Sequence, residues 1–274
     1  MKKFWVLLVG LFLLMGCSDK QDPKIKEEAL QLYVQKTNDL ASLDKYSMVF
    51  DGAIKIPESN LNETEMSANV RMDGIFNNKS NEGMISIAIT EQSASLNESI
   101  TMYFDKQYTY VNLDDQWYKE AFDSETQAVM DEALAEQGKM SLAEAEELFD
   151  SFKDTKYEVR TQDGLDGYQI TSKMDLDGLM KIMATYNGDT SLTQFKGIKD
   201  TVDSLNIEYI IFIPKEEGKY PVMSLTMDFE IMKSKMIMGP FSIKLNESKQ
   251  DVNIPKEAKK ATESTVEASI PSLS

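Results

Sequence analysis

Apolar residues fall at every second position over several short stretches of this chain. The clearest stretch runs from Tyr46 to Ile56 and ends at Pro57, with polar residues at the positions between. This period is typical of a strand that buries one face. The same pattern recurs over residues 66–76, 85–89, 100–104, 108–113 and 117–119, with turn-forming residues between the stretches. Such spacing predicts an antiparallel meander that is covered on one side.

Other stretches have the period of helices. Asp22 followed by Pro23 predicts a helix start and a helix over residues 23–43. Ser141 and Glu144 have the spacing of a capping box, which predicts a helix behind them. Further helices are predicted over residues 122–137, 176–186 and 192–204. Strands return over residues 157–161, 167–172, 205–213, 223–231 and 235–245, the last of them broken at Gly239-Pro240.

The whole pattern predicts an α+β fold in which an antiparallel sheet packs on several α-helices. We expect one domain over residues 24–258. Residues 259–274 are small, polar and aperiodic, as are the three before them, and are predicted to form a disordered tail.

The amino terminus has a separate organisation. Lys2 and Lys3 precede an apolar run over residues 4–14, and Leu14-Met15-Gly16-Cys17 follows. A run of about 11 residues is shorter than the roughly 20 that a membrane-spanning helix needs. The layout is that of a secretory signal peptide over residues 1–16.

The last four residues of this segment resemble the lipobox of bacterial lipoproteins. The resemblance implies cleavage between Gly16 and Cys17, diacylglycerol on the Cys17 sulfur, and commonly an acyl chain on the new amino terminus. Residues 17–23 would then be the lipidated cysteine and a polar tether, and the protein would lie at the extracytoplasmic face of the cell membrane. The alternative is an ordinary signal peptide with an incidental cysteine.

Composition excludes several classes of function. The net charge is −17 and becomes −19 without the signal peptide, which argues against nucleic acid as a partner. Cys17 is the only cysteine, so no intramolecular disulfide can form, and the absence of histidine excludes Ser-His-Asp and Cys-His catalysis and imidazole zinc sites. We therefore expect no enzyme activity and no cofactor.

Three weaker chemical candidates have simpler explanations. Met232, Met236 and Met238 lack the histidine or cysteine support of a Cu(I) site. Asp175, Asp177 and Gly178 match only a fragment of a calcium loop, and helix capping by Asp175 explains them better. The acidic pairs Asp114–Asp115 and Asp163–Asp166 could in principle perform acid/base catalysis, as paired carboxylates do in glycosidases. Both pairs lie in predicted turns, however, where aspartate is favoured for its backbone geometry. We expect no metal site.

A helix, a long meander, helices and a return to strands, without a cysteine framework, resemble the LolA/LolB-like superfamily of lipoprotein carriers. The exported lipid-binding lipoproteins of mycobacteria are similar in plan. Tyr110-Val-Asn112, Trp117-Tyr118-Lys119 and Ile254-Pro255-Lys256-Glu257-Ala258 look like an uncharacterised group of Gram-positive lipoproteins. This resemblance implies a curved half-barrel that closes over helices around an apolar cavity.

Methionine is the most suggestive residue type in the predicted strands, because its flexible side chain can adapt to acyl chains of varied shape. The residues predicted to line a cavity are Met48, Phe50, Met66, Met72, Met102, Phe104, Met223 and Met227. The alternative is that they fill a solid core. The leading hypothesis is a lipid-anchored, non-catalytic protein that binds a lipid or another amphiphile. The rival is a tethered module without a cavity that docks an envelope protein on a sheet edge.

Overall fold

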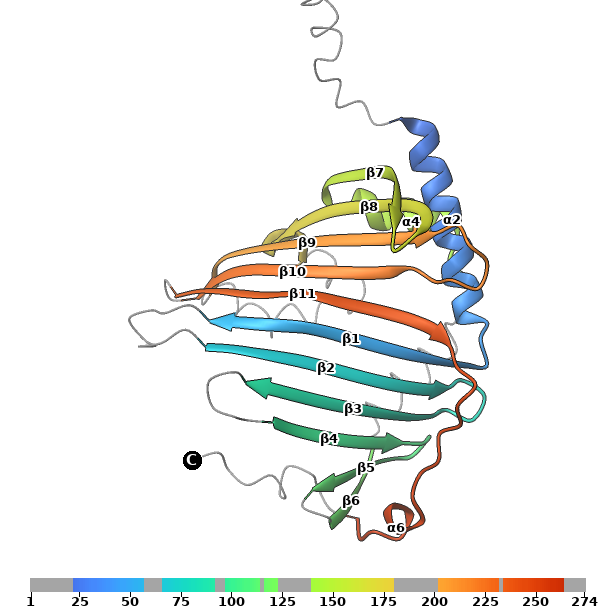
Figure 1. Cartoon of the computed structure of the whole chain (residues 1–274), viewed down its shortest axis with the longest axis vertical. Coiled ribbons are helices and arrows are strands. Elements are labelled where there is room, and N and C mark those ends of the chain that lie inside the picture. The colour runs from blue at the N-terminus through green and yellow to red at the C-terminus, as the bar shows by residue number, and fades with distance from the viewer. Residues whose placement is uncertain are drawn as a thin grey trace, which may run out of the picture.

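The described part of the chain forms one large antiparallel sheet. The computed structural model describes residues 22–56, 66–91, 97–113, 116–122, 139–179, 202–231 and 234–263. Eleven strands lie in the order β6-β5-β4-β3-β2-β1-β11-β10-β9-β8-β7, and the sheet is curved but not closed (Figure 1). The strands are β1 (Lys45–Ile56), β2 (Met66–Asn77), β3 (Glu82–Glu91), β4 (Asn97–Phe104), β5 (Tyr108–Leu113), β6 (Gln116–Ala121), β7 (Lys153–Gln162), β8 (Leu165–Asp175), β9 (Val202–Pro214), β10 (Val222–Ile231) and β11 (Ser234–Glu247).

The first and last strands lie side by side at the middle of the sheet. Tyr46 of β1 pairs with Phe76 of β2 on one side and with Glu247 of β11 on the other. Strands β1 to β6 form one meander and β7 to β11 form a second, so that the β1–β11 pair joins two locally connected halves.

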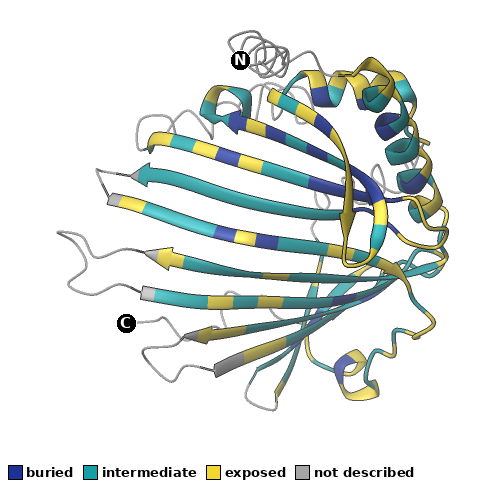
Figure 2. Cartoon of the chain, turned by 45° about the horizontal axis from the view of Figure 1, so that its top comes forward, coloured by how far each residue is buried: buried dark blue, intermediate teal, exposed yellow. Residues whose placement is uncertain are grey.

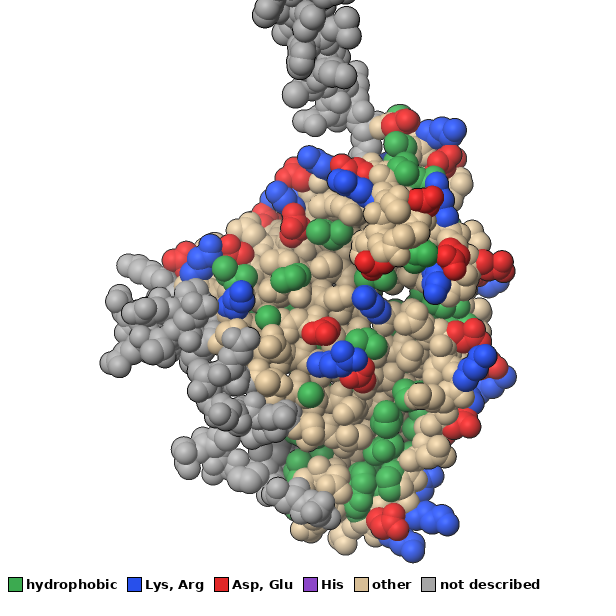
Figure 3. All heavy atoms as spheres, viewed as in Figure 1, with side chains coloured by type: hydrophobic (Ala, Val, Ile, Leu, Met, Phe, Trp, Pro, Cys, Tyr) green, Lys and Arg blue, Asp and Glu red, His purple; other side chains and the backbone are tan. Residues whose placement is uncertain are grey.

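The predicted alternation sorts the side chains onto two faces. Residues paired across neighbouring strands point to the same side of a sheet. The register pairs Phe50 with Met72 and Ile243 on the face that we call the inner face, and pairs Asp51 with Arg71 and Ser242 on the outer face. Figure 3 shows the outer face, where charged side chains are scattered over the strands.

Helices cover the inner face at one end of the sheet. Helix α2 (Pro23–Ala41) is capped by Asp22, and α4 (Leu142–Asp150) begins with a full Ser141–Glu144 capping box, both as predicted. Figure 2 shows many of the buried positions in α2 and the nearby strands. We call this the helix-covered end. Its buried core is Ala29, Leu30, Ala145, Phe149, Tyr157, Tyr168, Ile170, Ile211 and Ile213.

Polar contacts fix α2 on this end. The Tyr168 hydroxyl donates a hydrogen bond of 2.5 Å to the Glu28 carboxylate. Lys36 is only 4% exposed, and its ammonium donates to the backbone carbonyl oxygen of Glu216 in the β9–β10 turn. These contacts join the helix to strands that are distant in sequence.

The structure corrects three details of the sequence prediction. Residues 202–204, predicted as the end of a helix, begin β9, where Val202 pairs with Ile231. Strand β11 continues through the cis Gly239-Pro240 bond, because register shifts against both neighbours absorb the extra residues. Residues 256–259 form the short helix α6 (Lys256–Lys259), and Glu263 pairs with Lys119, so described structure extends into the segment that is predicted to be a disordered tail from residue 259.

Three predicted helices fall mostly outside the described residues. They are the helices predicted over residues 122–137, 176–186 and 192–204. Of the second, only residues 176–179 are described, as helical, and of the third only residues 202–204. The predicted antiparallel sheet and its combination with helices are confirmed.

Candidate functional site

Four successive rows of inner-face positions cross β1 to β5 and form a continuous apolar surface. Each row follows the pairing register from strand to strand. We call the positions named below the inner rows, and none of them carries a charge. They are Tyr46, Phe76, Gly83 and Phe104; Met48, Gly74, Ile85, Met102 and Val111; Phe50, Met72, Ile87 and Ile100; and Gly52, Val70 and Ile89. The register continues the first row from Phe104 to Thr109 of β5 and the last row from Ile89 to Glu98 of β4, so the uncharged surface ends at Ile89 and Ile100.

The structure brings the predicted lining residues to this one face. Met48, Phe50, Met72, Met102 and Phe104 lie in the inner rows, and all five are half-buried. On β10, Met223 and Met227 pair with Ile243 and Met238 and extend the inner face beyond β11, also half-buried. Met66 pairs with Ile56 at the start of β2.

Three phenylalanine rings lie against glycines of the inner rows. A Cβ atom built on Gly52 would lie 2.2 Å from Phe241, one on Gly74 would lie 2.6 Å from Phe76, and one on Gly83 would lie 2.0 Å from Phe104. These distances are too short for any side chain larger than hydrogen. The three rings therefore lie against the backbone of the glycines and do not project from the sheet. The space above the inner rows is thus not filled by these rings.

The glycines are the part of the site that sequence reasoning missed. A glycine inside a strand usually marks weakness or a close approach of another group. The available signal is a glycine at an inward position of β1, β2 or β3, with a phenylalanine at an inward position of the same or a neighbouring strand. The alternation identified the face, but it did not indicate how its rings would lie.

The two ends of the inner rows differ in character. At one end, the rings of Tyr46 and Phe76 stack at 4.9 Å, and Phe76 and Phe104 lie 6.0 Å apart. Burial raises the pKa of Tyr46. Further along the same strands, Ile89 and Ile100 are each 38% exposed. The apolar surface is thus most accessible to solvent at its aliphatic end.

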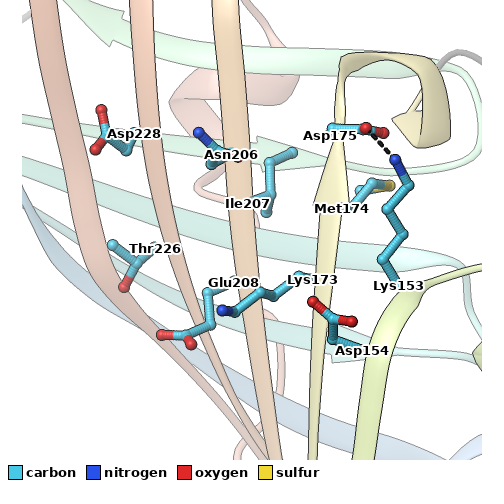
Figure 4. A pocket seen from close by; sticks show the side chains of 10 residues that line it. All are labelled: Lys153, Asp154, Lys173, Met174, Asp175, Asn206, Ile207, Glu208, Thr226 and Asp228. Atoms are coloured by element: carbon cyan, nitrogen blue, oxygen red, sulfur yellow. Dashed lines mark hydrogen bonds and ion pairs between the residues drawn. The ribbon is translucent and has the colours of Figure 1, made fainter.

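A separate pocket of about 320 Å³ lies across β7 to β10 at the strand ends (Figure 4). The register places Lys173, Glu208 and Thr226 in one outer-face row and Asp175, Asn206 and Asp228 in the next. Lys153 and Asp154 of β7 complete its polar lining, and the buried side chains Met174 and Ile207 belong to it as well. The pocket carries two basic and four acidic side chains.

An ion pair in this pocket holds Lys153 and Asp175 in their charged forms. Lys153 forms an ion pair with Asp175, and their hydrogen bond lowers the pKa of the Asp175 carboxyl and raises that of the Lys153 ammonium. A general acid or base at neutral pH needs the opposite shifts. Asp228 pairs with Lys235 at 2.9 Å. The pocket therefore has the electrostatics of a surface ion-pair network.

The remaining candidate residues have structural roles where they are described. Asp175 accepts a hydrogen bond of 3.0 Å from the Gly178 amide, which confirms helix capping. Asp163 lies in a turn with a positive φ, and Asp166 accepts from Thr161. Met236 and Met238 pair with inner-face residues of β10. Outside the described residues lie Gly16, Cys17, Asp114, Asp115 and Met232.

Metal-binding groups and membrane-spanning helices are both missing from the part of the chain that the structure describes. No group of three or more acidic, cysteine or histidine side chains in this part could hold a metal ion. None of its helices has both the length and the apolarity that crossing a membrane requires.

Comparison with known proteins yields only distant structural similarity. No protein-family model matches the sequence, and no curated protein matches it significantly. The crystal structure of LprF from Mycobacterium bovis aligns over 84% of this chain and 97% of that chain, with 10% identity and a TM-score of 0.40. A DUF1329 family protein from Desulfovibrio piger aligns over 83% and 94%, with 9% identity and a TM-score of 0.26. At these TM-scores, neither structure determines the fold or the function of this chain.

Proposed function

We propose that this chain is a lipid-anchored extracytoplasmic protein whose inner rows bind the apolar part of a lipid or another amphiphile. The observation that carries the proposal is the uncharged, half-buried surface of the inner rows. An apolar surface that stays partly open to solvent across several strands favours an interaction site. Burying it under a ligand is favourable by about 25 cal/mol for each Å² removed from water.

The flat phenylalanine rings support a ligand site over a solid core. In a close-packed core, side chains interdigitate and leave few voids. The rings on Gly52, Gly74 and Gly83 instead lie against the backbone. Methionine at Met48, Met72 and Met102 adds a surface that can adjust to chains of different shape.

The anchor is the part of the proposal that rests on residues 14–17 alone. The lipobox-like Leu14-Met15-Gly16-Cys17 supports cleavage before Cys17 and diacylglycerol on its sulfur. Mass spectrometry of the protein isolated from cell membranes would give a mature chain that begins at a lipid-modified Cys17. Recovery of an intact Met1, or of an unmodified Cys17 thiol, would contradict the anchor but not the ligand site.

The proposal assigns no catalytic role. The strongest cluster of titratable groups, the pocket over β7 to β10, has pKa shifts that keep Lys153 and Asp175 charged. Without histidine, an enzyme of this sequence would rely on such carboxylates and lysines. Turnover abolished by replacing one acidic residue of this pocket would overturn this assignment.

A module that docks proteins on a sheet edge is the competing candidate. Strand β7 is an edge strand and carries Val159, which is 56% exposed. The same strand has a register shift near Lys153, a positive φ at Asp154, and exposed charged residues at several positions. Bulges and charges are the devices that prevent strand addition at an edge. The edge is therefore a poorer site than the inner rows.

Ligand binding can be tested with matched variants on the two faces of β4. The mature chain with Cys17→Ser is delipidated and titrated with a fluorescent fatty acid. Met102 faces inward, whereas its neighbour Thr101 pairs with Ser86 on the outer face. Met102→Gln changes polarity with little change in size, so we expect weaker probe binding. Thr101→Gln should bind as the parent does.

Two measurements accompany the titration. Thermal unfolding of both variants shows whether a loss of binding is only a loss of folding. Lipid extracted from the cell-derived protein identifies the natural ligand. If neither probe nor extracted lipid is found with the folded protein, the proposal is wrong, and crosslinking that captures one protein partner would favour the edge module.

A further inference from the structure

The inner rows have a direction, because their two ends are built differently. The aromatic row of Tyr46, Phe76, Gly83 and Phe104 lies at one end. Ile89 and Ile100 lie toward the other end of β3 and β4. The difference between the two ends predicts the orientation of a bound amphiphile. This inference rests on the proposed function.

The aromatic end is braced by contacts between two turns. The Asn78 amide donates to the Asp44 carbonyl oxygen at 2.9 Å, and the Asn78 side chain donates to the Leu43 carbonyl oxygen at 2.8 Å. Lys79 and Asp44 form an ion pair at 2.5 Å. The turn before β1 is thereby fixed to the turn between β2 and β3. This end of the inner rows is held in one arrangement.

The aliphatic end is where apolar side chains meet solvent. Ile89 and Ile100 are each 38% exposed, whereas Ile85, Ile87 and Met102, which lie nearer the aromatic row, are half-buried. The stacked rings of Tyr46 and Phe76, and the Phe104 ring tilted against Phe76, lie at the opposite end of the rows. A molecule that approaches from water meets accessible apolar surface first at the two isoleucines.

We infer that an amphiphile enters the inner rows at the Ile89–Ile100 end and lies along β2 to β4 with the tip of its apolar chain at the Tyr46–Phe76–Phe104 row. Six residues separate Gly83 from Ile89 along β3, which is about 20 Å at roughly 3.4 Å per residue. A long acyl chain fits such a length when extended. Its polar group remains in water at the Ile89–Ile100 end, because the apolar positions stop there and the row of Ile89 continues into Glu98 of β4.

The cysteine content makes the orientation measurable. With Cys17→Ser, the mature chain has no thiol, so one introduced cysteine can be labelled alone. Ile100→Cys reports on the aliphatic end. Thr109→Cys, a change of similar size, reports on the aromatic end, because Thr109 pairs with Phe104. Ser99→Cys and Tyr103→Cys place the same label on the outer face.

The probes are two fatty acids, one with a nitroxide near its carboxylate and one with a nitroxide near its methyl end. The tip nitroxide should quench the fluorophore at position 109 more strongly than the one at position 100. The carboxylate-proximal nitroxide should give the reverse order. Labels at positions 99 and 103 should be quenched by neither.

Each other outcome has a defined meaning. The reverse order, or equal quenching at both inner positions, overturns the orientation while the proposed function stands. Quenching only at the outer positions overturns both. Absence of probe binding to the unlabelled Cys17→Ser chain contradicts the proposed function itself.

A second measurement avoids bulky labels. In the unlabelled chain with methyl-labelled methionine, the tip nitroxide should broaden the signals of Met48 and Met102, in the row next to the aromatic one, more than that of Met72, one row further away. Met84 pairs with Ile75 on the outer face and should not change. Stronger broadening of Met72 than of Met102 by the tip nitroxide would contradict the orientation.

Discussion

The helix-covered end and the inner rows belong to one sheet and follow one alternation, yet their side chains are buried to different extents. At the helix-covered end, Phe149 is 1% exposed and lies edge-on to Tyr33 at 5.2 Å. In the inner rows, Phe50 is half-buried, although it stacks on Phe241 at 4.9 Å. The same type of residue thus packs into a core in one region and lines an accessible surface in the other.

This difference separates stability from binding within one fold. Fully buried side chains contribute most to the free energy of folding, because both hydrophobic transfer and close packing act on them. A surface that keeps part of its apolar area in water gives up some of that stabilisation and gains a place for a ligand. We therefore expect the helix-covered end to determine stability and the inner rows to determine affinity.

The largest expected effect is on the free energy of unfolding. Phe149→Ala should lower it by about 3–5 kcal/mol, because the ring is buried against Tyr33 of α2 and Tyr157 of β7. Phe50→Ala should lower it by only about 1–2 kcal/mol, since part of the side chain is already in contact with water. Denaturant titrations of both variants measure the two values. Equal losses would show that the two regions do not differ.

An intermediate effect is expected from Gly83→Ala. Its new Cβ would lie 2.0 Å from the Phe104 ring, so the ring must move away from the sheet. Overpacking of this kind costs about 1–3 kcal/mol. The displaced ring should also weaken binding of the fluorescent fatty acid.

A double variant checks that cause. Phe104→Leu combined with Gly83→Ala should be more stable than the sum of the two single changes predicts, because the contact that causes the strain is gone. Additive losses in unfolding titrations would mean that the ring is not what the new methyl group meets.

The smallest effect concerns the pH dependence of the helix-covered end. The hydrogen bond from Tyr168 lowers the pKa of the Glu28 carboxyl. Stabilisation from this bond is therefore present above the unfolded-state pKa of Glu28 and is lost as the pH falls through the lowered folded-state value. Tyr168→Phe should reduce the free energy of unfolding, measured by denaturant titration, at pH 7 but hardly at pH 3. An equal reduction at both pH values would exclude the Glu28 carboxylate as the cause.

The sequence predicts the sheet well, because its signal is local. Alternation with period two identifies the strands and sorts Met48, Phe50 and Met72 onto one face without any tertiary information. The capping signals at Asp22 and Ser141 give the starts of α2 and α4 correctly. Strand faces and helix starts depend on residues that are close in sequence, so the sequence alone predicts them.

What the sequence does not predict depends on partners distant in the chain. Residues 202–204 have a helical pattern on their own, and pairing with β10 makes them a strand. The ring of Phe241 lies against Gly52 only because β11 returns beside β1. The orientation of the site and the accessibility of Ile89 and Ile100 likewise follow from the register of several strands. Periodicity carries no information about such pairs.

The pairing of β1 with β11 also governs when the protein can finish folding. Residue 46 must wait for residue 247 before the middle of the sheet can form, whether the chain emerges from a ribosome or from a membrane channel. Contacts this far apart in sequence form slowly. Until then, β1 presents an unpaired edge to its surroundings, where strands of other molecules can add. The interval between the emergence of the first strand and that of the last is therefore when this protein is most prone to aggregate.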